Sequence, residues 1–469
     1  MTHSVATSAP SSGTQTSHPR RVLAVMCAGM FIVLLDVTAV NVALPSIGTG
    51  LHTDVHGLQW VVDAYAVAIA GLLLAAGTLG DRIGHRRVVM LGFALFGVAS
   101  VGCALAPTVG VLVTARAVQG VGAALLLPGT MALIADAYPL RSAQARALGT
   151  WAAVSSLALP AGPVIGGALV SLVGWQLVFW INIPIVVAVL VAITALAPAD
   201  ATHAVGRLDL AGSIGPVIVL SAGVFAIIEA GRGAPMSTVL AAATVAICTT
   251  AWTLMMERRR ADPALPLNLL RQGSFAGPNL VAMTMNLVFN GTLFVTTLYL
   301  QQSRALSPVT AGVAVLPMAV PLVLLAPVSG RLIARFGPRM PVLVGCSLGL
   351  VGGLTLLGVS VGGPIAVLLV SIMVTGLGGG LITTAVVSAA IQAAPRGRAG
   401  LATGVSNTAR QVGTATGVAV FGAIAGSPAA AGEFTYRIHV LGIVAAVLWL
   451  IALTLTWTLP HRRKSTSVR

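Results

Sequence analysis

Long apolar segments alternate with short polar ones over almost the whole chain. The apolar segments are about 20 residues or longer, the length that an α-helix needs to cross the hydrocarbon core of a bilayer. The pattern predicts an all-α polytopic membrane protein with fourteen transmembrane spans, at residues 22–47, 58–79, 88–106, 109–134, 145–170, 176–197, 210–230, 237–256, 276–301, 309–330, 341–359, 365–390, 401–426 and 438–459. An even number of spans puts both termini on the same side of the membrane.

The composition supports this class of protein. Hydrophobic residues make up 57% of the 469 residues and charged residues only 8%, whereas soluble domains are about 45–50% apolar and about 25% charged. The single lysine, Lys464, follows an arginine and cannot complete a phosphate-binding GxxxxGK[ST] loop. The four cysteines have unrelated spacings that fit no metal site. We therefore expect neither an enzyme nor a bound cofactor or metal.

The net charge of +15 follows from where the basic residues lie. With the N-terminus inside, 21 of the 26 basic residues fall in cytoplasmic segments, three in outer loops (Arg232, Arg304, Arg437) and two within spans (Arg116, Arg410). Cytoplasmic loops of membrane proteins are enriched in Arg and Lys. The asymmetry predicts a plasma-membrane protein with both termini cytoplasmic, and it explains the positive charge without a nucleic-acid partner.

An internal repeat divides the chain. The segment Gly77–Arg86 recurs 253 residues later as Gly330–Arg339, with Gly, Leu, Arg, Gly and Arg in matching places. We expect two related six-helix halves at 22–197 and 276–459, with two inserted helices in 198–257 and a cytoplasmic linker at 258–275. The remaining segments are a disordered cytoplasmic tail at 1–21 and a basic cytoplasmic tail at 460–469. Transporters built from such repeats alternate access around a site near the bilayer midplane.

The repeated segment lies in a predicted cytoplasmic loop. It contains Gly77, Asp81, Arg82, Gly84 and Arg86. Glycines allow the two flanking helices to turn sharply, and Asp81 is expected where the third span begins, because a negative charge suits a helix N-terminus. The arginines can pair with carboxylates or with helix C-termini across the interface of the halves. This pattern resembles the signature loop of the major facilitator superfamily, and the resemblance implies that fold.

Two further spans strengthen the resemblance. Gly162, Pro163 and Gly166 in span 145–170 are similar to the antiporter motif of exporters, which would act as a hinge or a seal. Leu35-Asp36-Val-Thr38-Ala-Val-Asn41 in span 22–47 is similar to the first-span motif of the fourteen-helix drug:proton antiporters of the EmrB/QacA type. The resemblance runs over nearly all of residues 22–459.

Few acidic residues are available to move protons. Residues 263–432 contain none, and Asp36 and Asp63 are the acids placed within spans of the first half. Arg116 resembles an arginine of the superfamily that is implicated in proton coupling. Burial favours a neutral carboxyl group and a nearby arginine favours a charged one. We expect Asp36 to carry the proton with Arg116 modulating it, or the two to form a permanent ion pair, while Asp63 is a carrier, a cation-binding residue or an interfacial cap. Glu229, near the outer end of span 210–230, is a further candidate.

The sequence indicates the residues of the substrate cavity less clearly than the charged residues. The resemblance places the spans 22–47, 109–134, 276–301 and 365–390 around it. The candidate lining residues in these spans are Asn41, Gln119, Met283, Asn286, Asn290 and Phe294. Polar, aromatic and methionine side chains together suit adaptable binding of amphipathic molecules, although the asparagines can instead join helices by hydrogen bonds. For Arg410 we expect one of three roles: it caps helix carbonyl groups, pairs with an acid of the first half or binds an anionic part of the substrate.

These features together predict a proton-coupled exporter of small amphipathic drugs or antibiotics. Export of an endogenous metabolite or lipid by the same mechanism is the alternative. A membrane receptor or enzyme without transport activity is a third possibility, but the sequence contains no recognisable ligand-binding domain or catalytic motif that would favour it. The expected partners are the substrate, protons and the lipid bilayer, and the expected oligomeric state is a monomer.

Overall fold

The computed structural model describes residues 18–138, 140–196, 210–259, 267–360, 362–395, 399–426 and 431–459, and within this part all regular secondary structure is helical. Residues 1–17 of the predicted N-terminal tail, residues 260–266 of the predicted linker and the predicted C-terminal tail lie outside it. The predicted N-terminal tail ends earlier than residue 21, because α1 begins at Pro19. The long helices are α1 (Pro19–Gly50), α2 (Val55–Ile83), α3 (His85–Ala104), α4 (Val109–Ala137), α5 (Arg141–Leu172), α7 (Asn182–Leu196), α8 (Leu210–Arg232), α9 (Met236–Arg258), α11 (Gly273–Leu298), α14 (Ala326–Phe336), α15 (Arg339–Thr355), α16 (Ala366–Ala393), α17 (Ala399–Ala425) and α18 (Ala431–Leu455). The shorter helices are α6 (Leu177–Trp180), α10 (Leu267–Leu270), α12 (Pro308–Ala314) and α13 (Leu316–Leu324).

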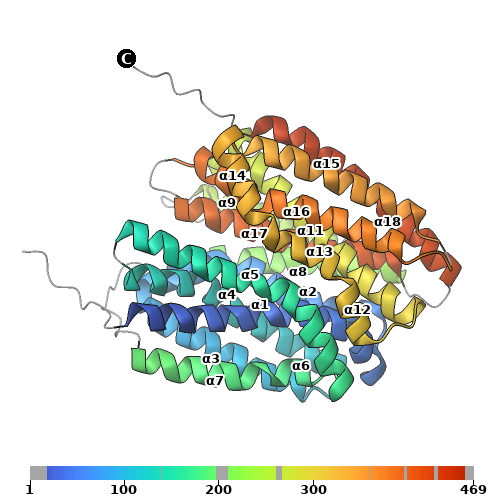
Figure 1. Ribbon diagram of the computed structural model, residues 1–469, viewed down its shortest axis with the longest axis horizontal. Coiled ribbons are helices and arrows are strands. Elements are labelled where there is room, and N and C mark those ends of the chain that lie inside the picture. The colour runs from blue at the N-terminus through green and yellow to red at the C-terminus, as the bar shows by residue number, and fades with distance from the viewer. Residues whose placement is uncertain are drawn as a thin grey trace, which may run out of the picture.

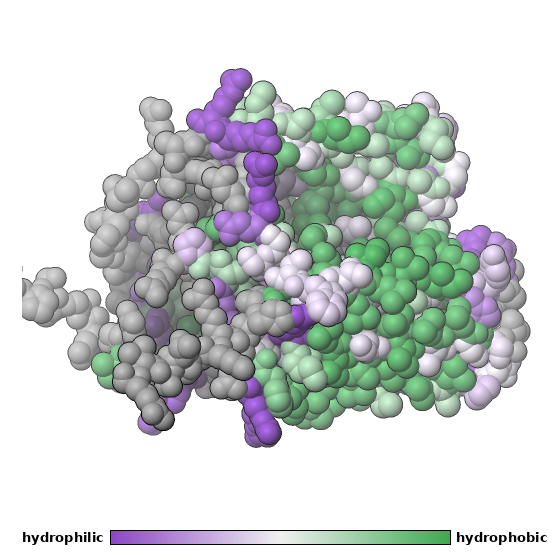
Figure 2. All heavy atoms as spheres, turned by 90° about the horizontal axis from the view of Figure 1, so that it is seen from above, coloured by the Kyte–Doolittle hydropathy of each residue, from purple (hydrophilic) through white to green (hydrophobic). Residues whose placement is uncertain are grey.

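Twelve candidate membrane spans are present in the described residues, and a bent pair, α13 with α14 at 44°, raises the number to thirteen. The protein is thus a multi-pass membrane protein. The predicted span 401–426 coincides with α17, which contains the polar residues Arg410 and Gln411 and is not among these candidates. Fourteen spans therefore remain a prediction. Figure 2 shows the broad apolar surface that a bilayer would cover, with hydrophilic residues toward its two ends.

The helices pack in two groups (Figure 1). Among the earlier helices, α1 packs against α5 and α7, and α4 packs against α2 and α3. Among the later ones, α11 packs against α16 and α17, and α15 packs against α16 and α18. Helices α8 and α9 pair with each other, and α8 also contacts α2 and α17.

The repeated sequence segment forms the same turn twice. A single glycine separates α2 from α3: Gly84 has φ 98°. Gly337 has φ 83° at the end of α14, two residues before α15. A residue with a side chain is strained in this region of φ, so both turns need glycine. Because one residue suffices for the turn, α2 extends to Ile83. The expectation that Asp81 begins the third span is therefore wrong: it lies in the last turn of α2, and its side chain is outside the described part.

Two predicted spans are broken. Residues 308–336 form three pieces, α12, α13 and α14, which are separated at Val315 and Leu325. Prolines 317, 321 and 327 remove helical hydrogen bonds in this stretch. Ile181 separates α6 from α7, so that Asn182 begins α7. In contrast, α5 continues through Pro160 and Pro163.

The two groups of helices touch near one end of the molecule, which we call the closed end and which holds residues 51–54 and 304–307. Nε2 of Gln59 on α2 donates to the carbonyl oxygens of Val418 and Ala419 on α17 at 3.2 and 2.9 Å. Nε2 of Gln301, just beyond α11, donates to the carbonyl oxygen of Val42 on α1 at 2.9 Å. Helix α5 packs against α12 and α13.

Candidate functional site

A buried ion pair lies among the earlier helices. Nη1 of Arg116 on α4 donates to Oδ2 of Asp36 on α1 at 2.5 Å, and the two side chains are 1% and 0% exposed. Nη1 also donates to Oε1 of Gln119 at 2.8 Å, and Nε donates to the carbonyl oxygen of Val61 at 3.1 Å. The ring of Tyr65 lies under the guanidinium, with its centroid 4.2 Å from Cζ. The pairing of Asp36 with Arg116 satisfies both charges in a buried place, where an unpaired charge is very costly.

The other carboxylate oxygen of Asp36 accepts two more hydrogen bonds. Nε2 of Gln119 donates to Oδ1 at 3.1 Å, and Nδ2 of Asn182 donates to the same oxygen at 2.9 Å. Both amides also donate to Oγ of Ser100, at 2.9 and 3.2 Å. Four helices, α1, α3, α4 and α7, therefore contribute to one hydrogen-bond network, which we call the Asp36 network: Asp36, Ser100, Arg116, Gln119 and Asn182.

The sequence reasoning identified three members of this network and missed two. Arg116 and Gln119 are three residues apart and share one helix face, as predicted. Ser100 and Asn182 were not singled out. Asn182 lies in an otherwise apolar segment, Trp180-Ile-Asn-Ile-Pro, and a polar residue inside a span is a signal for an interhelical contact.

Asp63 on α2 lies outside the Asp36 network. It is completely buried, and neither of its carboxylate oxygens has a hydrogen-bond partner within the described residues. Gln59, one turn earlier on the same helix, contacts α17, and one turn later Ala66 and Val67 pack against Ala415 and Ala419. Asp63 therefore faces the interface of α2 with α17. An unpartnered carboxyl group in such surroundings is stable mainly in its neutral form.

The predicted antiporter motif lies where three helices meet. A Cβ atom at Gly166 would lie 2.8 Å from Cα of Ala39, and a Cβ at Gly162 would meet the hydroxyl of Thr38, both on α1. Next to them on α5, Gly167 approaches Pro308 of α12, and the carbonyl oxygen of Pro163 lies against Gly312. The motif thus allows the backbones of α1, α5 and α12 to approach closely.

Of the predicted signature-loop residues, Arg86 is placed by a hydrogen bond. Its Nη2 donates to the carbonyl oxygen of Thr194 near the C-terminus of α7, at 3.1 Å. This agrees with the expected cap of a helix C-terminus, but the cap belongs to the earlier group of helices and does not cross to the later one. Gly77 has open space around its Cα.

The predicted substrate-lining residues contact neighbouring parts of the protein, and none of them lines the cavity described below. Asn286 and Asn290 bond to carbonyl oxygens one turn earlier on α11, and Nδ2 of Asn290 also donates to Thr414 of α17 at 3.1 Å. Phe294 is completely buried. Met283 touches Gly413 through its backbone. On the earlier helices, Nδ2 of Asn41 donates to the carbonyl oxygen of Val37 at 2.9 Å.

Arg410 is partly buried in α17, and its Nε atom has no hydrogen-bond partner in the described part of the chain.

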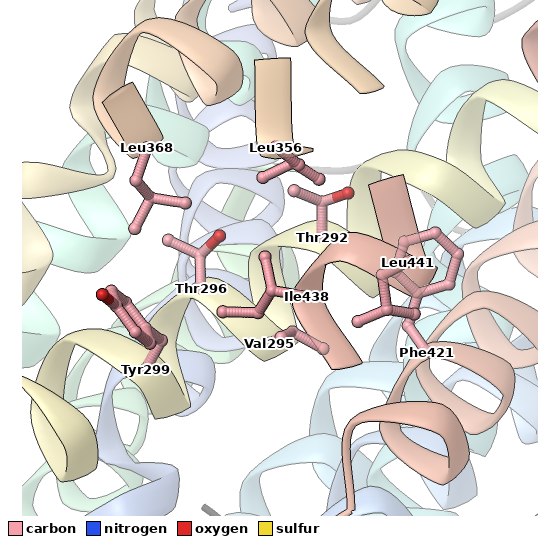
Figure 3. A pocket seen from close by; sticks show the side chains of 9 residues that line it. All are labelled: Thr292, Val295, Thr296, Tyr299, Leu356, Leu368, Phe421, Ile438 and Leu441. Carbon is pink, nitrogen blue, oxygen red and sulfur yellow. The ribbon is translucent and has the colours of Figure 1, made fainter. Parts of the chain in front are cut away.

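A small cavity opens among the later helices (Figure 3). Its lining residues are Thr292, Val295, Thr296, Tyr299, Leu356, Leu368, Phe421, Ile438 and Leu441. It holds about 10 Å³, roughly the room for one water molecule. Drug-sized ligands need about 300–1,000 Å³, so this cavity is too small to bind a drug.

Comparison with known proteins adds the family. The model of the Major Facilitator Superfamily matches residues 26–418. The chain is 34% identical to multidrug resistance protein Stp of Mycobacterium tuberculosis over 398 residues, which are 84% of this chain and 74% of that protein. It is 33% identical to the methylenomycin A resistance protein of Streptomyces coelicolor over 444 residues, 94% and 93% of the two chains. The tetracenomycin C resistance and export protein of Streptomyces glaucescens is 34% identical over 426 residues, 89% of this chain and 78% of that one.

Solved structures share the fold at low sequence identity. A peptide transporter of the POT family superimposes with a TM-score of 0.70 and 17% identity, covering 93% of this chain and 95% of that one. A bacterial homologue of the lysosomal transporter Spinster, in an inward-facing and unoccupied conformation, superimposes with a TM-score of 0.66 and 15% identity over 94% and 96% of the chains.

Proposed function

This chain belongs to the major facilitator superfamily, and from that premise we propose that it is a proton-coupled exporter of amphipathic drugs or antibiotics. It is a membrane transporter and not an enzyme. The names of its relatives support drugs and antibiotics as substrates, since they describe multidrug resistance, methylenomycin A resistance and tetracenomycin C export. The first-span motif around Asp36 favours the fourteen-helix drug:proton antiporters within the superfamily.

The buried Asp36–Arg116 pair is the observation that supports proton coupling. A buried carboxylate and a buried guanidinium compensate each other's charge, whereas removing one of them leaves an uncompensated buried charge. Protonation of Asp36 would release Arg116, and movement of Arg116 would favour protonation, so proton binding and rearrangement of α1 against α4 are coupled. The unpartnered Asp63 at the interface of α2 and α17 is the second candidate carrier, because movement of the two helix groups changes its surroundings.

The topology that we propose has fourteen spans. Helix α17 serves as one of them, because it packs tightly against α11: a Cβ atom at Gly413 or at Gly417 would meet the backbone of Met283 or Leu287. The halves are then 22–197 and 276–459, with α8 and α9 inserted. The distribution of arginines favours both termini in the cytoplasm. In this orientation the closed end faces outward, which corresponds to an inward-facing state.

Everted membrane vesicles that contain this protein test the function. Addition of a substrate such as ethidium, tetraphenylphosphonium or methylenomycin A should collapse a pre-formed pH gradient, and the response should be lost in Asp36→Asn. Loss of ethidium transport on removing the pH gradient, with ATP still present, would support the coupling. Correctly inserted protein that responds to no drug or antibiotic in the panel would contradict drug export and favour a metabolite or lipid as the substrate.

A further inference from the structure

Asn182 occupies an unusual position in the Asp36 network. It begins α7 immediately after the break at Ile181, and its side chain is completely buried. Its Nδ2 donates to Oδ1 of Asp36 at 2.9 Å and to Oγ of Ser100 at 3.2 Å. Its Oδ1, in contrast, has no hydrogen-bond partner within the described residues. A buried carbonyl oxygen without a donor is costly, and this one lies in the same amide group that contacts Asp36.

The two amides that donate to Asp36 differ in their freedom. Both polar atoms of Gln119 are engaged: Oε1 accepts from Arg116 and from Sγ of Cys103 at 3.7 Å, while Nε2 donates to Asp36 and Ser100. Inversion of this amide would break the bond with Arg116. Inversion of the Asn182 amide breaks only the two bonds that its Nδ2 donates, to Asp36 and Ser100, because Oδ1 accepts none within the described residues.

Protonation of Asp36 creates the need for such an inversion. While Asp36 is a carboxylate, its Oδ1 accepts from two amide donors. A proton on that oxygen becomes a third donor facing them, and it needs an acceptor. A primary amide has two donors on one side and an acceptor on the other, so rotation by about 180° exchanges them.

We infer that Asn182 is a positioning residue for the proton on Asp36, whose amide donates to the carboxylate and inverts to accept from the carboxylic acid. Asn182 neither gains nor loses a proton. It keeps the cost of both protonation states of Asp36 low, so that a proton can bind and leave during each transport cycle. This inference rests on the proposed function, in which Asp36 is the proton carrier.

The other groups around Asp36 do not offer this exchange. Arg116 can only donate. The titratable groups beside the pair are Tyr65 on α2, whose ring stacks on the guanidinium, and Cys103 on α3, which contacts Gln119; Asp63 lies two residues before Tyr65. The hydrogen bonds from α1 to its other neighbours involve uncharged groups: Thr38 donates to the carbonyl oxygen of Ala158 on α5, and Val42 accepts from Gln301 just beyond α11.

Proton release from the purified full-length protein tests the inference. Ethidium is added in weak buffer across pH 5.5–8.5, and released protons and bound ethidium are both measured. We expect Asn182→Leu to bind ethidium within about threefold of wild type but to release less than a third of the protons. Asn182→Ser, which leaves room for a water molecule that can donate and accept, should recover more than half of the release.

Asn279 supplies the matched control. It is a buried asparagine of α11 whose Oδ1 also lacks a partner in the described part, but its Nδ2 donates to the carbonyl oxygen of Phe275 and not to a carboxylate. Asn279→Leu should release as many protons as wild type.

Normal release in Asn182→Leu, with release abolished in Asp36→Asn, would overturn the role of Asn182 alone. Normal release in Asp36→Asn would overturn Asp36 as the carrier, and the role of Asn182 with it. If Asn182→Leu does not fold, Asn182→Ser decides by itself: its infrared difference spectrum should lose the asparagine carbonyl change that accompanies protonation of Asp36 in wild type, and retention of that change would overturn the inference.

Discussion

At the scale of single residues, the ion pair is easier to replace as a whole than to break. Arg116→Leu leaves Asp36 charged and buried, and it also removes the donor to the carbonyl oxygen of Val61. Breaking a buried pair typically costs about 3–5 kcal/mol, whereas replacing both members is often neutral. We expect Arg116→Leu to lower the free energy of unfolding by about that amount, and Asp36→Asn combined with Arg116→Leu to restore most of it. Unfolding in mixed detergent micelles measures both; a double variant no more stable than Arg116→Leu would contradict the pairing.

Asp63 should make the folded protein less stable as the pH rises, whereas a carboxylate that is paired with a cation has the opposite effect. Because its oxygens have no donor in the described structure, charging this group in the folded protein is unfavourable. Raising the pH should therefore destabilise the protein, and Asp63→Asn should remove this dependence between pH 5 and 8. Melting temperatures across this range measure the effect. Glu433→Gln is the control, because Glu433 is exposed and pairs with Arg437; an equal effect of both variants would contradict the prediction.

The sequence could identify the charged members of the site but not their full surroundings. Asp36 and Arg116 are recognisable because charges are rare in membrane spans. Their contact is visible only in the tertiary structure. The same holds for the difference between Asp36, which has three hydrogen-bond donors, and Asp63, which has none among the described residues. Asn182 is one polar residue in an apolar segment, and only the packing of α7 against α1 shows that it reaches Asp36.

At the scale of helices, glycines that look alike in the sequence have different roles. Gly84 and Gly337 have positive φ angles, where an added side chain costs about 1–2 kcal/mol. Gly77 and Gly330, the first glycines of the two copies, lie within α2 and α14 with open space around them. There, alanine should stabilise the helix by up to about 1 kcal/mol.

The corresponding alanine variants test this difference. Gly84→Ala and Gly337→Ala should each lower the melting temperature of the purified protein, because alanine disfavours the turn conformation. Gly77→Ala and Gly330→Ala should leave it unchanged or raise it slightly. Equal destabilisation by all four variants would show that spacing in the motif, and not the turn geometry, explains the glycines.

The sequence predicts where helices form, but it does not predict where a helix is interrupted. Apolar length identifies the segments, because each needs about 20 apolar residues to cross a bilayer. Proline content did not predict the breaks: α5 continues through Pro160 and Pro163, while residues 308–336 divide into three helices. Neighbouring helices that satisfy the freed backbone groups decide whether a proline interrupts a helix in a membrane.

At the scale of the whole molecule, we expect the close approach of α5 to α12 to hold the closed end together. Gly312 lies against the backbone of Pro163, and a Cβ atom at Gly167 would lie 2.6 Å from the carbonyl oxygen of Pro308. Contacts through backbone atoms cannot be relieved by rotating a side chain. The antiporter motif on α5 is thus adjacent to the contact between the two groups of helices, and its role as a hinge or a seal stays a prediction.

Enlarging Gly312 should open this end. Spin labels at positions 172 and 436, where Leu172 and Tyr436 are exposed, can report the separation of α5 from α18 once the exposed Cys248 is replaced by serine. We expect Gly312→Val to shift the distance distribution to longer values and to lower ethidium transport at least about tenfold, because a state that cannot close cannot alternate. Gly223→Val is the control, because Gly223 of α8 has nothing within 4 Å of its added Cβ. An unchanged distance in Gly312→Val would mean that the contact between α5 and α12 is a consequence of closure and does not hold the end closed.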